Sequence, residues 1–377
     1  MGRFRKQDIG LDIDRGALKA VQLSRGGGSY TLQHVGYHKL PPGVIADGEV
    51  ADHDRLVAEI KEFWGAHSFK GKSVILGVAN QKVVVRVLPF PKMSPQDLKS
   101  AIGFEAQDHI PMPLDEAVLD HISLGSSGEG SDLDRVLIVA AQKAMVSRYA
   151  SAIRTAGLRL TGIDVKALAL TRSILPNALF EAEGAILLMD IGAELTNLVV
   201  LQGGAPTLTR FVQGGSLYFA QSIADAANIS EEEADKQLMN PKVRLGSAAL
   251  QDEDNQNEVA DQEAEEESED DFDPALAYDI RRGLEDAVQL LAEDIQRSIE
   301  YHYSQPEARE VSQVFVSGEG ALVGGMDNYL SELLGISTQR ANLLGKLSAN
   351  RSNVSGEQIK VMEPVLAVSF GLAMEGE

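Results

Sequence analysis

The stretch Asp12-Ile-Asp-Arg-Gly-Ala-Leu-Lys-Ala-Val-Gln-Leu23 can be laid over Asp190-Ile-Gly-Ala-Glu-Leu-Thr-Asn-Leu-Val-Val-Leu201 at a constant offset of 178 residues. Each stretch begins at the end of an apolar run, Ile9–Ile13 or Ile186–Ile191, which presents an aspartate. A short turn and a second apolar run follow, a pattern that predicts a β-hairpin. Because the hairpin occurs at matching places in both halves of the chain, the sequence predicts a duplicated fold with a cleft between the halves.

The remaining elements are predicted from helix ends and from periodicity. Ser94-Pro95 and Ser230 have the N-cap pattern of a helix start, and Asp273-Pro274 opens a long helix. That helix carries one apolar stripe at steps of three and four residues. Strands are expected at Val74–Val78, Val83–Leu88, Val136–Ala141, Asn197–Leu201 and Val314–Ser317. Strands that alternate with helices in this way predict an α/β fold.

Composition and charge exclude several classes of protein. The 377 residues carry a net charge of −22, and thirteen Asp or Glu without any Lys or Arg lie between Gln251 and Asp273. This segment cannot form an apolar core, and we expect a disordered surface loop. The mildly acidic remainder argues against nucleic acid as a partner. The chain has no cysteine, so thiol chemistry and disulfides are excluded. No apolar run is long enough to cross a bilayer, and we expect a cytoplasmic protein without direct membrane insertion.

Both hairpins and the glycine-rich segment Val314-Phe-Val-Ser-Gly-Glu-Gly-Ala321 resemble the phosphate and adenosine segments of the actin/Hsp70/sugar-kinase superfamily. Four further stretches make the chain similar to the PilM family of type IV pilus assembly proteins, which is related to the division protein FtsA. These stretches are Arg86-Val-Leu-Pro-Phe-Pro-Lys-Met-Ser94, Phe104-Glu-Ala-Gln-Asp-His-Ile-Pro-Met-Pro-Leu-Asp-Glu116, Val139-Ala-Ala-Gln-Lys143 and Thr209-Arg-Phe-Val-Gln-Gly-Gly215.

The resemblance implies an actin-like ATPase fold, with two duplicated RNase H-like halves around a nucleotide cleft and inserted FtsA-like subdomains 1C and 2B. Subdomain 1A would comprise residues 1–89 and 171–188, with a C-terminal helix at 364–377 returning to it. Subdomain 1C would be inserted at 90–170. Subdomain 2A would comprise 189–224 and 309–363, and subdomain 2B would comprise 225–308 with the acidic loop at 251–272.

The resemblance also implies a site for ATP and Mg²⁺. Asp12 and Asp190 would hold the metal, and each taken alone could equally be a turn former at a strand end. The other expected nucleotide-binding residues are Gly16, Lys19, Gly192, Ala193, Thr196, Gly214, Gly215, Asp235, Gly318, Gly320 and Ala321. Two departures from the family pattern weaken nucleotide binding: Asp14 replaces a glycine of the first turn, and Leu238 replaces a lysine. Whether ATP is bound or hydrolysed stays open, and we expect weak ATPase activity at most.

The expected function is that of a scaffold in the inner-membrane platform of type IV pili. It would capture the cytoplasmic N-terminal tail of a PilN-like membrane protein, contact other platform proteins and lie at the inner membrane through its partner. Self-association stays open. The expected peptide groove is lined by Leu88, Phe90, Phe104, Ile110 and Met112, although any of them could instead be a core residue. The alternatives are an FtsA-like division or cytoskeletal ATPase and a small-molecule kinase. The seven histidines show no metal-ligand spacing with Asp or Glu.

Overall fold

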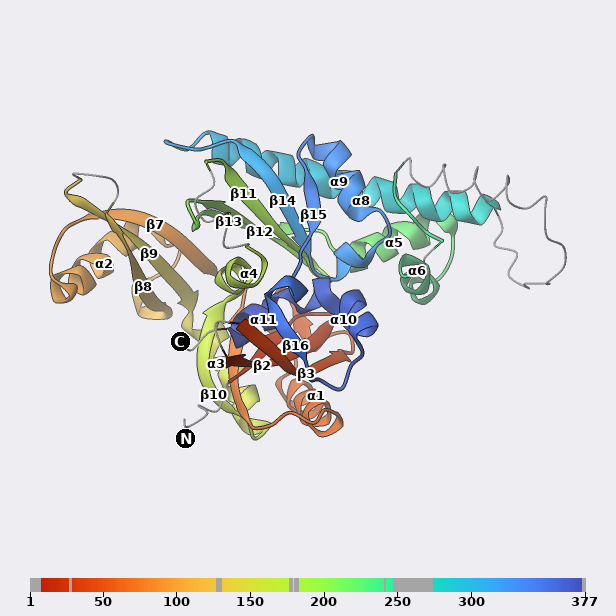
Figure 1. Ribbon diagram of the computed structural model, residues 1–377, viewed down its shortest axis with the longest axis horizontal. Coiled ribbons are helices and arrows are strands. Elements are labelled where there is room, and N and C mark those ends of the chain that lie inside the picture. Colours follow the sequence, from red (N-terminus) through yellow and green to blue (C-terminus); the bar gives the residue numbers. More distant parts are fainter. Residues whose placement is uncertain are drawn as a thin grey trace.

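The computed structural model describes residues 8–26, 29–126, 131–175, 179, 183–240, 242–246 and 274–374. Two large sheets lie in separate lobes, and a small third sheet projects from one side (Figure 1). The expected acidic loop at 251–272 lies outside the described residues. Within them, no helix is both long and apolar enough to span a membrane.

The first lobe is built on a six-stranded sheet in the order β10-β6-β1-β2-β3-β16. Helices α1 and α3 cover one face, where Leu11, Leu56, Ile60 and Ile153 belong to one buried cluster. The small strands β4 (Ile45–Ala46) and β5 (Glu49–Val50) form a short ribbon that precedes α1. The elements of the lobe are β1 (Ile9–Ile13), β2 (Ala17–Gly26), β3 (Ser29–Lys39), α1 (His53–Ala66), β6 (Ser73–Val78), α3 (Lys143–Thr155), β10 (Arg159–Val165) and β16 (Leu347–Asn350).

The second lobe repeats the arrangement with a five-stranded sheet, β13-β12-β11-β14-β15. Helices α5, α8 and α9 lie along its outer face (Figure 1). The apolar stripe predicted for α8 is confirmed, because Ile280, Leu284, Val288, Ile295 and Ile299 are buried on one side of it. The elements are β11 (Ala185–Ile191), β12 (Leu195–Gln202), β13 (Ala205–Gln213), α5 (Ser216–Ala227), α6 (Glu231–Leu238), α8 (Pro274–Tyr303), β14 (Val311–Ser317), α9 (Met326–Leu334) and β15 (Thr338–Arg340).

Helices α4 (Lys166–Ile174) and α11 (Ala367–Ala373) lie between the two sheets (Figure 1). They form a third buried cluster with residues of both sheets, such as Ile75 of β6 and Leu188 of β11. The packing is close, because a Cβ at Gly371 would lie 1.9 Å from the Ala169 carbonyl oxygen and one at Gly10 would lie 2.1 Å from that of Ser369. The two lobes therefore share one apolar layer.

The inserted unit is a three-stranded sheet, β7-β9-β8, covered by one helix. Ser94 begins that helix as predicted, because its hydroxyl accepts from the Asp97 backbone N–H at 3.2 Å. The separate sheet spans residues 83–142, whereas the expected insertion was 90–170. The difference arises because α3 packs on the first lobe and β10 pairs with β6. The elements are β7 (Val83–Pro91), α2 (Pro95–His109), β8 (Ala117–Ser126) and β9 (Leu133–Gln142).

The sequence predicted that the chain returns to the first lobe at residue 364, but in the structure it returns earlier. Strand β16 pairs with β3, and the next helix is α10 (Gly356–Met362). A single-turn helix at Glu363–Leu366 then leads into α11, which is buried along its whole length. The expected C-terminal core helix is thus present, preceded by a strand that the sequence pattern did not indicate.

Candidate functional site

The two hairpins bring Asp12 and Asp190 to equivalent positions at the facing ends of the two sheets. Asp12 on β1 lies opposite Lys19 on β2 and beside Gly77 on β6. Asp190 on β11 lies opposite Asn197 on β12 and beside Ser317 on β14, whose hydroxyl donates to its carboxylate at 3.0 Å. The offset of 178 relates Lys19 to Asn197, so the duplication places a cation in one half where the other half has an amide.

The first turn is closed by its own side chain. One carboxylate oxygen of Asp14 accepts the backbone N–H groups of Gly16 at 2.8 Å and Ala17 at 2.9 Å. Its other oxygen pairs with the Lys19 ammonium. Backbone N–H groups of such turns are the donors that bind phosphate in a concave backbone site. In this chain the Asp14 carboxylate already occupies two of these donors.

Two buried lysines carry the positive charge of the site. The Lys19 ammonium lies 3.4 Å from Asp12, and the Lys166 ammonium lies 2.6 Å from Asp12 and donates to the Ile13 carbonyl at 3.2 Å. Burial opposes the charged form of Lys19, but the carboxylates of Asp14 and Asp12 outweigh it and raise its pKa well above the usual range. Burial also acts to raise the pKa of Asp14, yet the charges of Lys19 and Lys166 hold it below its usual value. Both members of the Asp14–Lys19 pair are therefore charged at neutral pH.

The second turn is held by contacts of small residues. A Cβ at Gly215 would lie 2.3 Å from the Gly192 carbonyl oxygen, so only glycine allows the two segments to approach. The Thr196 side chain is fully buried, and its hydroxyl donates to the Gly214 carbonyl at 2.8 Å. Thr196 was expected to contact the nucleotide. Its hydroxyl instead joins β12 to the Gly214 segment, because both lie in the interior of the second lobe.

The third glycine-rich segment places the carboxylate of Glu319 in the cleft. Gly318 has a φ of 88° and lies against the carbonyl of Ile191, and the following carboxylate accepts from the Ser216 hydroxyl at 3.2 Å and from the Tyr37 hydroxyl at 3.4 Å. Burial, followed by the charge of Asp14, raises the pKa of Glu319. Gly320 and Ala321 are buried under the end of β11, so they position this segment through packing.

Two ion pairs join the lobes across the cleft. Arg15 of the first turn pairs with Glu194 of the second turn, and the same carboxylate accepts the Asp47 backbone N–H at 3.1 Å. At the other side of the cleft, the Lys39 ammonium lies 2.6 Å from the Asp235 carboxylate on α6. Asp235, which the resemblance assigned to the nucleotide, has a cation from the opposite lobe as its partner in this structure. These contacts join the two described lobes across the cleft.

A cavity of about 50 Å³ remains at the base of the cleft, and residues of both turns line it, among them Lys166, Asp190 and Asn197. Asn197 is 4% exposed, and neither polar atom of its amide has a partner within the described ranges. Burial, and to a lesser degree the negative charge of Asp12, raises the pKa of Asp190. Buried polar groups are normally hydrogen-bonded, so the Asn197 amide is available to a polar group in this cavity. Lys166 and Asn197 at this side of the cleft suit a phosphate, and the Asp190 carboxylate suits a metal ion. The negative charges of Asp14 and Glu319 would repel a phosphate.

The five residues expected to form the peptide groove do not share one surface. Phe90 and Ile110 are 2% and 7% exposed in two small buried clusters of the inserted unit. Leu88 packs against the cluster of Phe90, and Met112 packs against that of Ile110. Phe104 belongs to neither cluster and is 75% exposed. Phe90 and Ile110 are therefore buried and do not line an open groove. Phe90 of β7 packs with Ile102 of α2, and Ile110, at the C-terminal end of α2, packs with Ala140 of β9. Met112 borders a hollow at the end of α2, together with Gln107 and Leu114.

Sequence reasoning missed Lys166, Glu194 and Glu319. Lys166 is the first residue of α4 and lies 154 positions from Asp12, so no local pattern connects the two. Glu194 lies in the turn that the sequence singled out, but only the packing of the lobes reveals Arg15 as its partner. Leu238, expected to weaken nucleotide binding, is 1% exposed in the core of the second lobe, so it does not face the cleft.

Comparisons with known proteins agree with this geometry. The family described as type IV pilus assembly protein PilM matches residues 10–244 and 254–377. A chain of a PilM-PilN type IV pilus biogenesis complex is 25% identical, with a TM-score of 0.78 and 98% of each chain covered. Ethanolamine utilization protein EutJ from Carboxydothermus hydrogenoformans is 13% identical, with a TM-score of 0.54 and coverage of 99% of this chain and 90% of EutJ.

MreB5 of Spiroplasma citri, solved with ADP, is also 13% identical, with a TM-score of 0.52 and coverage of 97% of this chain and 94% of MreB5. At this level of identity, EutJ and MreB5 show the fold alone. The expected fold class, an actin-like ATPase fold, is confirmed.

Proposed function

We propose a function from the premise that this chain belongs to the family of the type IV pilus assembly protein PilM. It is the actin-like scaffold of the inner-membrane platform of a type IV pilus, and it captures the cytoplasmic N-terminal tail of a PilN-like membrane protein. The protein lies in the cytoplasm and reaches the inner membrane, together with other platform proteins, through that partner. The proposal rests on the structural likeness of the whole chain to a chain of the PilM-PilN complex.

The peptide site that we propose is the open edge of the inserted unit rather than the core beneath α2. Strand β8 pairs only with β9 in this sheet, so its outer edge offers backbone donors and acceptors. Val118 and Ile122 on this strand are 45% and 52% exposed. An extended peptide that adds to a sheet edge gains affinity from main-chain pairing and specificity from alternate side chains. A disordered tail loses entropy when it binds, so we expect micromolar affinity.

A titration with a short fluorescent peptide from the N-terminal tail of a PilN-like protein of the same organism tests the partner. We expect saturable binding, which Ile122→Asp abolishes while Val361→Asp leaves it unchanged. Val361 is 67% exposed on α10 in the first lobe, so it controls for the new charge. The proposal fails if the folded protein does not bind the peptide, or if the two variants behave alike with unaltered melting temperatures.

We further propose that the cleft binds ATP with Mg²⁺ weakly, after the cross-lobe ion pairs open. MreB5 of the same fold has been solved with ADP and with AMPPNP. Asp12 and Asp190 would hold the metal, since Mg²⁺ takes one or two carboxylates and keeps several waters. When bound, the metal would neutralise phosphate charge. Lys166 and Asn197 would orient the phosphates at the base of the cleft, and Gly192, Ala193 and Gly214 would allow the backbone to approach them.

The arrangement favours a structural or switching role for the nucleotide over rapid turnover. The Asp14 carboxylate takes the first-turn donors, and Lys19 neutralises it rather than an incoming phosphate. A phosphate-release assay separates this scaffold from a division or cytoskeletal ATPase and from a small-molecule kinase of the same fold. Turnover on the order of 10 s⁻¹, as in metabolic enzymes, would favour the kinase. We expect rates far below that value.

A further inference from the structure

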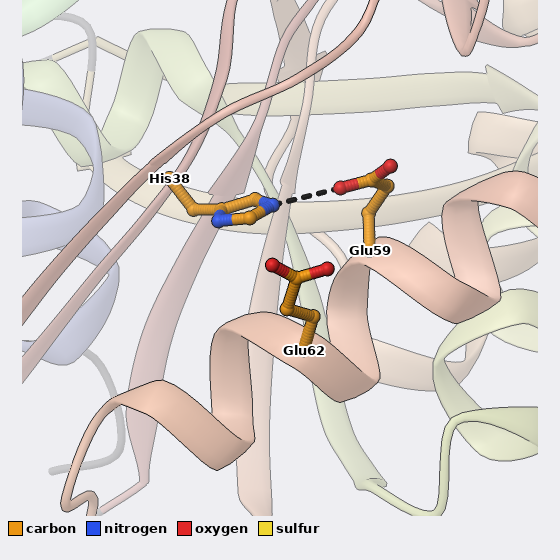
Figure 2. Close-up of side chains that lie close together, drawn as sticks. All are labelled: His38, Glu59 and Glu62. Atoms are coloured by element: carbon orange, nitrogen blue, oxygen red, sulfur yellow. Dashed lines mark hydrogen bonds and ion pairs between the residues drawn. The ribbon is translucent and has the colours of Figure 1, made fainter.

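One histidine and two glutamates meet where α1 packs against β3 in the first lobe (Figure 2). His38 comes from β3, and Glu59 and Glu62 come from successive turns of α1. The His38 Nε2 atom lies 2.8 Å from a Glu59 carboxylate oxygen, and one ligand atom from each of the three residues lies within 4.8 Å of the others. No local spacing indicated this group, because His38 lies 21 residues from the first glutamate.

The group is set into the protein rather than spread over its surface. The His38 and Glu59 side chains are only 20% and 15% exposed, and the imidazole packs against the Phe63 ring with centroids 6.0 Å apart. Glu62 approaches from the solvent side and makes no ion pair or hydrogen bond with any part of the chain that the structure describes. Two carboxylates three residues apart on one helix face repel each other. A cation between them would remove this repulsion.

The chemistry of the donors selects the kind of cation. Mg²⁺ and Ca²⁺ prefer sites made of oxygen ligands alone, whereas imidazole with carboxylates suits Zn²⁺ and similar transition-metal ions. The chain has no cysteine, so histidines are its softest available ligands besides methionine. Zn²⁺ commonly binds three protein ligands and takes water in the fourth position. We propose that His38, Glu59 and Glu62 bind one Zn²⁺ ion, at a site separate from the nucleotide cleft.

The place of the group on β3 gives this site a structural consequence. Side chains alternate along a strand, so Tyr37 and Lys39 point to the opposite face from His38. There they contact Glu319 and Asp235 in the cleft. A metal ion that joins His38 to α1 therefore holds the strand segment from which two contacts of the closed cleft arise.

The test uses the full chain, stripped of metal by chelation and dialysed. Zn²⁺ is titrated calorimetrically in excess Mg²⁺, so that Mg²⁺ saturates the oxygen sites of the acidic segment. We expect one equivalent of Zn²⁺ to bind. Glu62→Gln should weaken it by about tenfold or more, since even residues that only orient metal ligands account for such factors. Co²⁺ provides a second readout, because a bound imidazole nitrogen and carboxylates produce visible absorption bands that the same variant should lose.

His53→Ala is the matched control. His53 also lies on α1 with a neighbouring carboxylate, Asp54, at 3.0 Å, but without a second carboxylate in the group. We expect this variant to bind Zn²⁺ as the wild type does. His38→Ala should also lose Zn²⁺ binding. Because Glu62 is exposed, Glu62→Gln tests the site without the folding defect that a change at the half-buried His38 can cause. The proposal is overturned if no saturable binding occurs in Mg²⁺, if Glu62→Gln binds normally, or if His53→Ala is the variant that loses the ion.

Discussion

Replacing Asp14 with glycine should strengthen ATP binding, although it removes the Asp14–Lys19 ion pair from the folded protein. The carboxylate caps the N–H groups of Gly16 and Ala17 and pairs with Lys19. Glycine frees both donors and leaves the Lys19 ammonium with Asp12, 3.4 Å away, as its remaining carboxylate. Each released group is one that can bind phosphate.

The magnitude follows from the charge that is removed. A carboxylate about 5 Å from a phosphate charge costs roughly 3 kcal/mol at an effective dielectric constant near 20. If Mg²⁺ offsets about half of this repulsion, about 1.5 kcal/mol remains, which corresponds to roughly tenfold in affinity. The same substitution should lower the free energy of unfolding by about 1–3 kcal/mol, because a buried lysine loses its nearest partner.

Asp14→Asn separates the two causes. The amide oxygen can still accept from Gly16 and Ala17 but carries no charge, so this variant should show the electrostatic part of the gain without the freed donors. Calorimetric titration with ATP and Mg²⁺, at a temperature where all three proteins are folded, should rank the glycine variant first, the asparagine variant second and the wild type last. Unchanged or weaker binding by a folded glycine variant would refute the reasoning.

Three further outcomes are expected. Glu194→Gln should loosen the closed lobes by breaking the Arg15 pair and speed amide hydrogen exchange in both turns, and unchanged exchange would contradict a cross-lobe latch. Because the pKa of Glu319 is raised in the folded protein, the free energy of unfolding of the wild type should fall as pH rises above the ordinary value of 4.5. Glu319→Gln should lose this pH dependence in urea unfolding measured at a series of pH values, and an equal pH dependence in both proteins would contradict it. Deleting residues 251–271 should change loop-closure entropy by about 1 kcal/mol or less, so a melting temperature lowered by more than about 10 °C would show a structural role.

The two sites that we propose, the open edge of β8 for the peptide and the cleft for the nucleotide, lie in different parts of the protein. Strand β7, on the other edge of the inserted sheet, is close to β13 of the second lobe (Figure 1). A movement of the second lobe on nucleotide binding would therefore also displace β7 and the inserted unit. Peptide titrations with and without ATP measure this coupling, and thermodynamic reciprocity requires the peptide to change ATP affinity by the same factor.

The sequence alone determined the features that depend on neighbouring residues. The two aspartate hairpins were predictable because apolar runs and small turn residues act within about ten positions, and the register of Asp12 and Asp190 agrees with the offset of 178. Helix α2 was predictable from its cap, and α8 from the spacing of its apolar stripe. These signals are local, so they survive without knowledge of the fold.

Only the tertiary structure decided how those elements use their charges. Lys166 reaches Asp12, and Arg15 reaches Glu194, across more than 150 residues of chain. Phe90 could have faced a peptide, but the position of α2 buried it. The group of His38 with Glu59 and Glu62 likewise exists because α1 packs on β3. In each case the partner is selected by the distance between packed elements, which residue types and local spacing do not contain.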